Sequence, residues 1–520
     1  MMKRELKEAA RYDKASIDRD IREGFRRGHR WHNRFHLEMP YGFLSAPTGL
    51  CWWKGEYHIF ANWNPFGCES DEKCWIHTST RDFISYSLPE MALWPDAAED
   101  SNGCGYGCAC TEDGHMRIVY TGATGGSLSP VQRFGTWLKA EKKIRRDEIA
   151  INTIPDGFGD IFRGPHIFKR NGTRYMILGT NGADKDGCAV IYREENSLSG
   201  EDLLYEAQEE SSEVSYEGDS LPFSSSGKKW TFLGRIQTRY DGKPMGYIWE
   251  NPSLLHFGSY DVLAFCPKGL EPQTYAWQNL YQSGYMTGKI SFSSMKFLGG
   301  EFQEFDKGFD FYAPQIFEHA GRHFMIGWMC MPDRPKDYPT IENGWMGNFT
   351  MPRELVLRQG HIYSKPSEEM KSLRIAGSEQ EIHKRDIVHD DWPLAEGAEA
   401  LLNIRMGNAE SIEVSVRYGI ERLTFRFDRR TQVMEIDRSE MKNGGRGVRR
   451  FMLSADDRLN LRLFVDHSAV EAFLQYGEEA ASLLVFPEKY ILPELALDAH
   501  APIAEITGTI WKLDGMKLRA

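Results

Sequence analysis

The sequence predicts an all-β protein in which a β-propeller is followed by a β-sandwich, after a short N-terminal helical extension. Between residues 31 and 360, short β-rich runs recur between polar turns. From residue 381 onward, apolar and polar residues alternate as they do in half-buried strands. Hairpins that recur at intervals along a chain favour radial repetition over a sheet built from βαβ units.

The first segment, residues 1–30, is the predicted helical extension. Leu6, Ile17, Ile21 and Phe25 stand at helical spacing among charged residues. We expect a helix packed on the edge of the next domain, and a helix that binds a partner protein is the alternative. The charged N-terminus lacks the apolar run of a secretory signal.

Two predicted domains and a linker follow the extension. Residues 31–360 form the propeller, residues 361–380 a polar linker, and residues 381–520 the sandwich. The strand–turn–strand pattern of residues 166–179 is typical of the first domain. The alternation at Leu461–Val465 is typical of the second.

The composition indicates a cytoplasmic protein without a membrane or nucleic-acid partner. The 520 residues, 41% of them hydrophobic, suffice for more than one core. Mean hydropathy is −0.50, and no apolar run approaches the ~20 residues of a membrane helix. The net charge is −12 and no long basic run occurs. The nine cysteines include no C-x-x-C pair, so we expect reduced thiols and no metal site.

Residues 36–50 carry the longest motif of the chain. They read HLEMPYGFLSAPTGL, and a short strand and Asn62–Pro65 follow. This run resembles the N-terminal signature of glycoside hydrolase family 32, the β-fructosidases that include invertases, levanases and sucrose-6-phosphate hydrolases. The family reads H-x-x-P-P-x-G-W-x-N-D-P-N-G-L, so its nucleophilic aspartate falls on Ala46. The resemblance implies a propeller of five blades and a fructoside site that here lacks this carboxylate.

Other family segments occur in the same order along the chain. Residues 75–82, 309–315 and 345–355 resemble framework motifs, and residues 102–109 stand where F-S-G-S contacts sugar. The resemblance implies substrate-binding positions at Ser45, Asn62, Trp75, Tyr106, Arg163 and Gly164.

Glu250 is the predicted acid/base. Hydrolysis of a glycoside with retention takes two carboxyl groups about 5–5.5 Å apart. Glu250 lies in Tyr-Ile-Trp-Glu-Asn-Pro, which resembles W-E-C-P with Asn251 in place of the cysteine. Its neighbour Trp249 predicts an apolar environment, which would raise the pKa of the carboxyl group as a proton donor requires. Arg163-Gly164-Pro165 resembles R-D-P, so Gly164 replaces a second family acid.

Five other carboxylates lie near motif segments and could stand in for the nucleophile, and the sequence favours none of them: Glu38, Glu69, Asp71, Asp160 and Asp310.

Asp466-His467-Ser468 has the residue types of a catalytic triad. Because neighbouring residues of a strand point to opposite faces, we expect a strand and its turn there instead.

The preferred hypothesis is a glycoside hydrolase that acts on β-fructofuranosides (sucrose, sucrose 6-phosphate or fructo-oligosaccharides) through Glu250. The alternatives are a carbohydrate-binding descendant without catalysis, a glycosidase of changed substrate, and an assembly protein that uses the helix and the sandwich as surfaces. A small carbohydrate is the expected ligand, a homo-oligomer is left open, and hydrolysis of this type calls for no cofactor.

Overall fold

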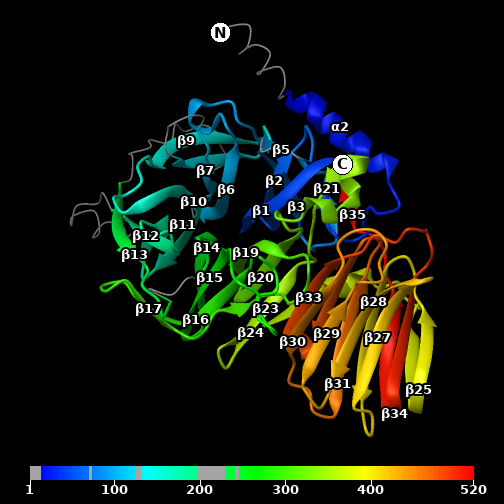
Figure 1. Ribbon diagram of the computed structural model, residues 1–520. Helices are drawn as coiled ribbons and strands as arrows, with labels where there is room; N and C mark the ends of the chain where they lie inside the picture. Colours follow the sequence, from blue (N-terminus) through cyan, green and yellow to red (C-terminus); the bar gives the residue numbers. More distant parts are fainter. Residues whose placement is uncertain (1–12, 69–72, 125–129, 196–228, 241–244, 520) are drawn as a thin grey trace, which may run out of the picture.

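The computed structural model describes residues 13–68, 73–124, 130–195, 229–240 and 245–519 (Figure 1). It is an all-β structure with a β-propeller-like arrangement of sheets and a β-sandwich-like C-terminal domain. Within these ranges, every helix is too short or too polar to span a bilayer. The predicted order of extension, propeller and sandwich is confirmed in this outline, while the residue boundaries of the domains stay predictions.

Helix α2 (Lys14–Arg27) is the described part of the predicted extension, and residues 1–12 lie outside the described residues. Ile17 and Ile21 are buried because they share the face that meets the first sheet. Lys14 Nζ donates to the carbonyl of Met91 (2.6 Å), and Asp18 Oδ1 accepts from the Met91 amide (2.9 Å). The helix therefore packs on a domain edge, as predicted.

Five sheets make up the propeller-like part, and their strands pair mainly as antiparallel neighbours, with two parallel pairs in the first sheet. The first sheet holds β1 (Gly42–Trp53), β2 (Glu56–Asn64), β3 (Cys74–Thr80), β4 (Ser85–Ser87), β5 (Glu90–Leu93), β21 (Trp345–Met346) and β35 (Lys517–Arg519). The second holds β6 (Cys104–Glu112), β7 (His115–Gly122), β8 (Val131–Leu138) and β9 (Lys143–Ile151). The third holds β10 (Phe158–Arg170), β11 (Thr173–Gly182), β12 (Gly187–Glu194) and β13 (Trp230–Arg235).

The two remaining sheets of this part follow in chain order. The fourth holds β14 (Ile248–Phe257), β15 (Tyr260–Lys268), β16 (Gly284–Ser291), β17 (Lys296–Gly299) and β18 (Gln303–Glu304). The fifth holds β19 (Tyr312–His319), β20 (Arg322–Met329), β22 (Asn348–Phe349), β23 (Arg353–Arg358) and β24 (His361–Pro366). The first strands β1, β6, β10, β14 and β19 each lie beside the next, and β19 lies beside β1, so they close a ring.

The C-terminal domain is one ten-stranded sheet folded onto itself. Its strands are β25 (Gln380–Pro393), β26 (Ala398–Arg405), β27 (Ser411–Tyr418), β28 (Glu421–Asp428), β29 (Val433–Asp437), β30 (Val448–Met452), β31 (Arg458–Val465), β32 (Ala469–Leu474), β33 (Glu479–Leu484) and β34 (Glu494–Lys512). The N-terminal part of β34 pairs with β27, and its C-terminal part pairs with β26. This long strand thus belongs to both layers, which enclose one apolar core.

A buried network of charges joins the propeller-like part to the C-terminal domain. Arg353 donates from Nη1 to Asp306 (2.8 Å) and from Nε to Glu471 on β32 (2.8 Å). His36 donates to Asp466 (2.8 Å) and Glu471 (3.1 Å). Burial lowers the pKa of His36, but these two carboxylates outweigh it and raise the pKa to about 9, so the ring is protonated at neutral pH.

Candidate functional site

The five inner strands all bulge at one level of the ring. The register shifts lie between Leu44 and Pro47 in β1, Cys104 and Gly107 in β6, Arg163 and His166 in β10, Glu250 and Ser253 in β14, and Tyr312 and Gln315 in β19. A bulge changes the direction of a side chain. Four of these five bulges contain a proline, which has no backbone N–H for hydrogen bonding between strands. The predicted positions 45, 46, 106, 163, 164 and 250 all lie in or beside these bulges.

Glu250 is the centre of a charged cluster on this level. Its buried carboxylate forms an ion pair with Arg163 of β10 and another with Lys268 Nζ of β15 (2.9 Å). The Tyr312 hydroxyl of β19 donates to Glu250 Oε2 (2.7 Å). Glu250 and Arg163 therefore meet, as the family motifs imply, and the cluster adds Lys268 and Tyr312 to them.

The predicted rise of the Glu250 pKa is wrong. Burial does raise the pKa, but Arg163, Lys268 and the hydrogen bonds outweigh burial and lower the pKa to about 2. Trp249 cannot supply the expected apolar surroundings, because the next residue of a strand points to the other face. Its ring stacks on Phe265 (3.9 Å between centroids) in a separate core. In the ligand-free chain Glu250 is therefore a carboxylate.

Ala46 is fully buried and brings no charged group to the cluster. It packs in the same apolar core as Tyr106 and Tyr312. A hydrogen bond joins the hydroxyl groups of Ser45 and Tyr106, and burial raises the pKa of the Tyr106 phenol. Ala46 thus lies in an apolar core that also contains these two phenols.

Gly164 and Asn251 fit each other. A Cβ atom on Gly164 would lie 2.9 Å from Asn251 Oδ1, 3.2 Å from its amide nitrogen and 3.3 Å from its Cα. Gly164 has a φ of +71°, and Asn251 has a φ of +46°, a region that asparagine tolerates better than most residues. The side chain of Asn251 therefore takes the space into which a side chain at position 164 would grow. Residues 164 and 251 are therefore structurally coupled.

Asn62 and Trp75 are fully buried. Asn62 Nδ2 donates to the carbonyl of Cys104 (2.8 Å), and Trp75 Nε1 donates to the carbonyl of Gly105 (2.9 Å). Both side chains thus fix the backbone of β6 directly before Tyr106. Their predicted contact with a sugar stays a prediction.

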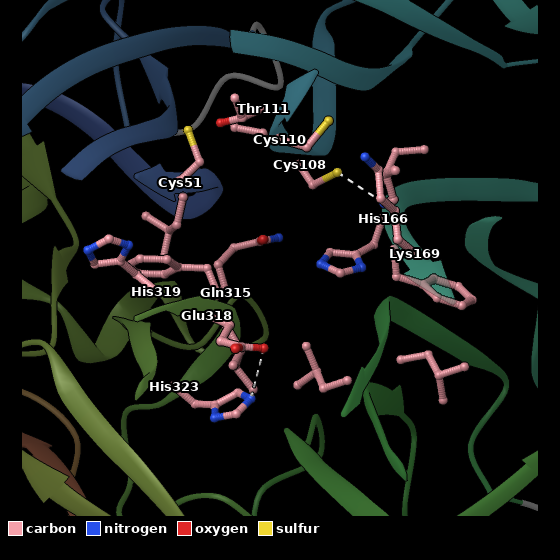
Figure 2. Close-up of a pocket in the computed structure, with 18 of the residues that line it drawn as sticks. Cys51, Cys108, Cys110, Thr111, His166, Lys169, Gln315, Glu318, His319 and His323 are labelled. Atoms are coloured by element: carbon pink, nitrogen blue, oxygen red, sulfur yellow. Dashed lines mark hydrogen bonds and ion pairs between the residues drawn. The ribbon is translucent and has the colours of Figure 1, made fainter. Parts of the chain in front are cut away.

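Two cavities lie along the inner ring. Arg163 and Tyr106 line one of about 390 Å³, together with Lys73, Thr121 and Asp160. The other, of about 460 Å³, is lined by residues that lie further along the same five strands. Figure 2 shows this second cavity, with its wall made by residues such as Cys108, Cys110, His166, Gln315 and His319. None of the predicted site residues lines it, so the charged cluster rather than the larger volume identifies the candidate site.

Two of the five candidate replacement carboxylates bind other groups, and a third lines the smaller cavity. Glu38 accepts from His32 and Asn33, and Asp310 accepts from Arg438 (2.6 Å) at the junction of the two domains. Asp160 is exposed at the mouth of the smaller cavity. Glu69 and Asp71 lie outside the described residues.

The expectation for Asp466-His467-Ser468 is met, because the three side chains bind other groups. Asp466 accepts from the amides of Arg34 and Phe35, His467 contacts the carbonyl of His32, and the Ser468 hydroxyl donates to that of Trp31. They fasten residues 31–36 to the C-terminal domain.

All nine cysteines are free thiols, and the described residues hold no metal-binding group of three or more His, Cys, Asp or Glu side chains.

Comparison with known proteins places this geometry in a family. Residues 36–218 and 217–366 match the N-terminal domain of glycosyl hydrolases family 32, and residues 369–500 match the C-terminal domain of that family. A sucrose-6-phosphate hydrolase of Bacillus subtilis is 31% identical over 88% of this chain and 89% of its own length. A raffinose invertase of Escherichia coli is 29% identical over 94% and 96%.

Solved structures agree with this assignment. The structure of a sucrose-6-phosphate hydrolase from Lactobacillus gasseri covers 97% of this chain and 98% of its own, with a TM-score of 0.81 and 25% identity. The chain belongs to glycoside hydrolase family 32.

Proposed function

We propose that this chain hydrolyses β-D-fructofuranosides at the Glu250 cluster, with sucrose, sucrose 6-phosphate or fructo-oligosaccharides as substrates. The observation that carries the proposal is the meeting of Glu250, Arg163 and Tyr312 on the bulged inner ring of a family 32 chain. The names of the relatives, sucrose-6-phosphate hydrolase and raffinose invertase, support this substrate class.

Hydrolysis breaks the bond between C2 of the fructosyl unit and the leaving oxygen. Overall, water supplies a hydroxyl group to C2 and a proton to the leaving oxygen. We assign the protonation of the leaving oxygen to Glu250. The attacking water releases its proton to solvent, and Glu250 takes up a proton from solvent before the next turnover. Because Ala46 offers no carboxylate, no covalent intermediate forms there, and water attacks C2 directly with inversion. Glu250 must bind a proton for this step, so a bound ligand has to weaken its pairing with Arg163 or Lys268.

The test is the release of fructose from sucrose, sucrose 6-phosphate and a short inulin or levan series. The chain as it stands, Glu250→Gln and Ala46→Asp are compared. We expect turnover by the unaltered chain and none by Glu250→Gln, and unchanged turnover in that variant would remove Glu250 from the mechanism. Turnover only by Ala46→Asp would identify a disabled fructosidase. Binding without any release would refute hydrolysis and identify a sugar-binding descendant.

We also propose that each of the five sheets is one blade, and that the protein is cytoplasmic. The closed ring of first strands supports the blade count, and nine free thiols suit a reducing compartment. The domain boundaries after residues 30, 360 and 380 belong to the same proposal. A crystal structure tests the blade count, and fractionation of cells tests the location.

A further inference from the structure

The larger cavity of the ring has no part in the proposed function. It has a volume of about 460 Å³, which is in the range of small-molecule sites, and it is shown in Figure 2. The bulge of β10 separates Arg163 of the charged cluster from His166 of the cavity wall. The bulge of β19 separates Tyr312 from Gln315 in the same way. The cavity therefore lies at a different level of the ring from Glu250.

His166 has a buried ring nitrogen that the protein leaves without a partner. Its Nδ1 has no hydrogen-bond partner among the described residues. Burial lowers the pKa of the ring to about 4, so the ring is neutral at pH 7 and carries one N–H donor and one acceptor nitrogen. A buried polar group without a partner is costly, and a hydroxyl group of a ligand in the cavity would remove that cost.

The other polar groups of the cavity interior are also neutral. Gln315 points into the cavity from the wall opposite His166 (Figure 2), and its Nε2 donates to the carbonyl of Gly107 (3.2 Å). Burial raises the pKa of the Cys108 and Cys110 thiols, so both thiols keep their protons. These groups can form hydrogen bonds with a ligand, but they offer it no charge.

The charged residues stand at the edge of the cavity, and their charges balance. Lys169 and Glu318 are both exposed at this edge and have opposite signs. Arg170 forms an ion pair with Asp261. An ion that entered the cavity would leave water for an interior without a counter-charge, which is costly. The lining thus favours a neutral ligand.

An aromatic pair forms another part of the wall. Trp52 of β1 and His319 of β19 both line the cavity, and their rings stack with the centroids 4.2 Å apart. Aromatic side chains pack well against apolar surface, and a sugar or polyol presents C–H groups as well as hydroxyl groups. Such a wall beside the neutral hydrogen-bonding groups suits a molecule that has both.

We propose that the larger cavity is a second ligand site, which binds a neutral polyhydroxylated molecule of monosaccharide size through hydrogen bonds to His166 and Gln315. The two nitrogens of the His166 ring bind hydroxyl groups of the ligand, one as a donor and one as an acceptor, and the Gln315 amide binds a further hydroxyl. This inference goes beyond the proposed function, because the site uses none of the groups of the Glu250 cluster.

Calorimetric titration of the full chain tests the inference. Glucose and sorbitol are the neutral probes, and gluconate and glucosamine are their charged counterparts. Neither neutral probe contains a fructosyl unit, so neither is a substrate of the proposed hydrolysis. We expect the neutral probes to bind about tenfold or more tightly than the charged ones, because the interior offers no counter-charge.

Variants locate the binding. His166→Phe keeps an aromatic ring and removes both nitrogens, so it should weaken glucose binding about tenfold, the scale of a lost hydrogen bond. Thr111→Trp places a large side chain at the exposed edge of the cavity and should also weaken binding. His389→Phe on β25 is the matched control and should leave the affinity unchanged, as should Glu250→Gln. Melting curves show that each variant is folded.

The outcomes separate this inference from the proposed function. If His166→Phe and Thr111→Trp bind glucose unchanged, or if Glu250→Gln abolishes binding, the ligand lies elsewhere and the inference is overturned. Tighter binding of gluconate or glucosamine would overturn the neutral ligand class. If no probe binds, the cavity holds water alone and the inference fails. None of these results alters the release of fructose that tests the proposed function.

Discussion

Replacing Gly164 by alanine tests whether Gly164 and Asn251 form one structural unit. An L-residue at a φ of +71° costs about 1–2 kcal/mol. The new Cβ also meets Asn251 Oδ1 at 2.9 Å, and such forced overlap typically costs about 1–3 kcal/mol. Gly164→Ala should therefore destabilise the chain by about 2–5 kcal/mol, a fall of roughly 4–10 °C in the melting midpoint for a domain of this size.

A double-mutant cycle separates the two contributions. Asn251→Gly removes the amide that meets the new Cβ and tolerates the φ of +46°. In that background Gly164→Ala should cost about 1–3 kcal/mol less, because the overlap of the new Cβ with Asn251 Oδ1 is gone. Gly172→Ala is the control for backbone strain alone, since Gly172 has a φ of +78° and no atom within 4 Å of its added Cβ.

The assay is the thermal melting midpoint of all variants at one scan rate, because a chain with two cores need not unfold in two states. Gly164→Ala should lower the melting midpoint more than Gly172→Ala does, because only the first adds an overlap. Only the shift caused by Gly164→Ala should become smaller in the Asn251→Gly background. Equal shifts for the two alanine variants, or an unchanged cost of Gly164→Ala in the Asn251→Gly background, would refute the pairing.

Three further predictions concern the charged groups. Arg353→Met should destabilise the chain by about 3–5 kcal/mol in urea unfolding, because it leaves buried carboxylates without their partner. Arg385→Met, which breaks an exposed ion pair, is the control and should cost at most about 1 kcal/mol in the same experiment. The folded-state pKa of His36 is raised from 6.5 to about 9, so its stabilisation is complete below pH 6.5 and is lost as the pH rises through 9. It amounts to about 3 kcal/mol. The difference in stability between the unaltered chain and His36→Gln should shrink by about that amount between pH 6.5 and pH 9 and above, and a constant difference would contradict it. Lys268→Met should raise the pKa of Glu250 above about 2, which a ¹³C-detected titration of glutamate carboxyls measures, and an unmoved titration would exclude Lys268 as a cause.

The order of helix, propeller-like part and sandwich-like part could be predicted from the sequence because hairpin patterns and helical spacing are local. The strand pairs near residues 166–179 and 461–474 and the helix at Lys14–Arg27 all follow from such patterns. The family motifs placed Glu250 and Arg163 at one site, and the structure brings them together. Prolines at the inner-strand bulges were a further signal that could have marked the level of the site.

The charge state of Glu250 could not be read from its neighbours in sequence. Trp249 points away from the carboxylate, and the cations that lower the pKa come from β10 and β15. Which residues of distant strands meet depends on bulges, and their register is a tertiary property. The same holds for Asn251, whose replacement of a cysteine looks mild in sequence and becomes coupled to Gly164 only in the folded chain.

Strand β34 constrains the order in which the C-terminal domain can fold. β34 pairs with β25, β26 and β27, and it is the last strand of this sheet in the chain. Neither layer can close before β34 has been synthesised, and its pairing of Gln380 with Ile510 closes a long loop, which slows folding. During synthesis the edges of β26 and β27 wait unpaired. The nascent domain is then open to aggregation, and a chaperone that covers strand edges would raise its yield.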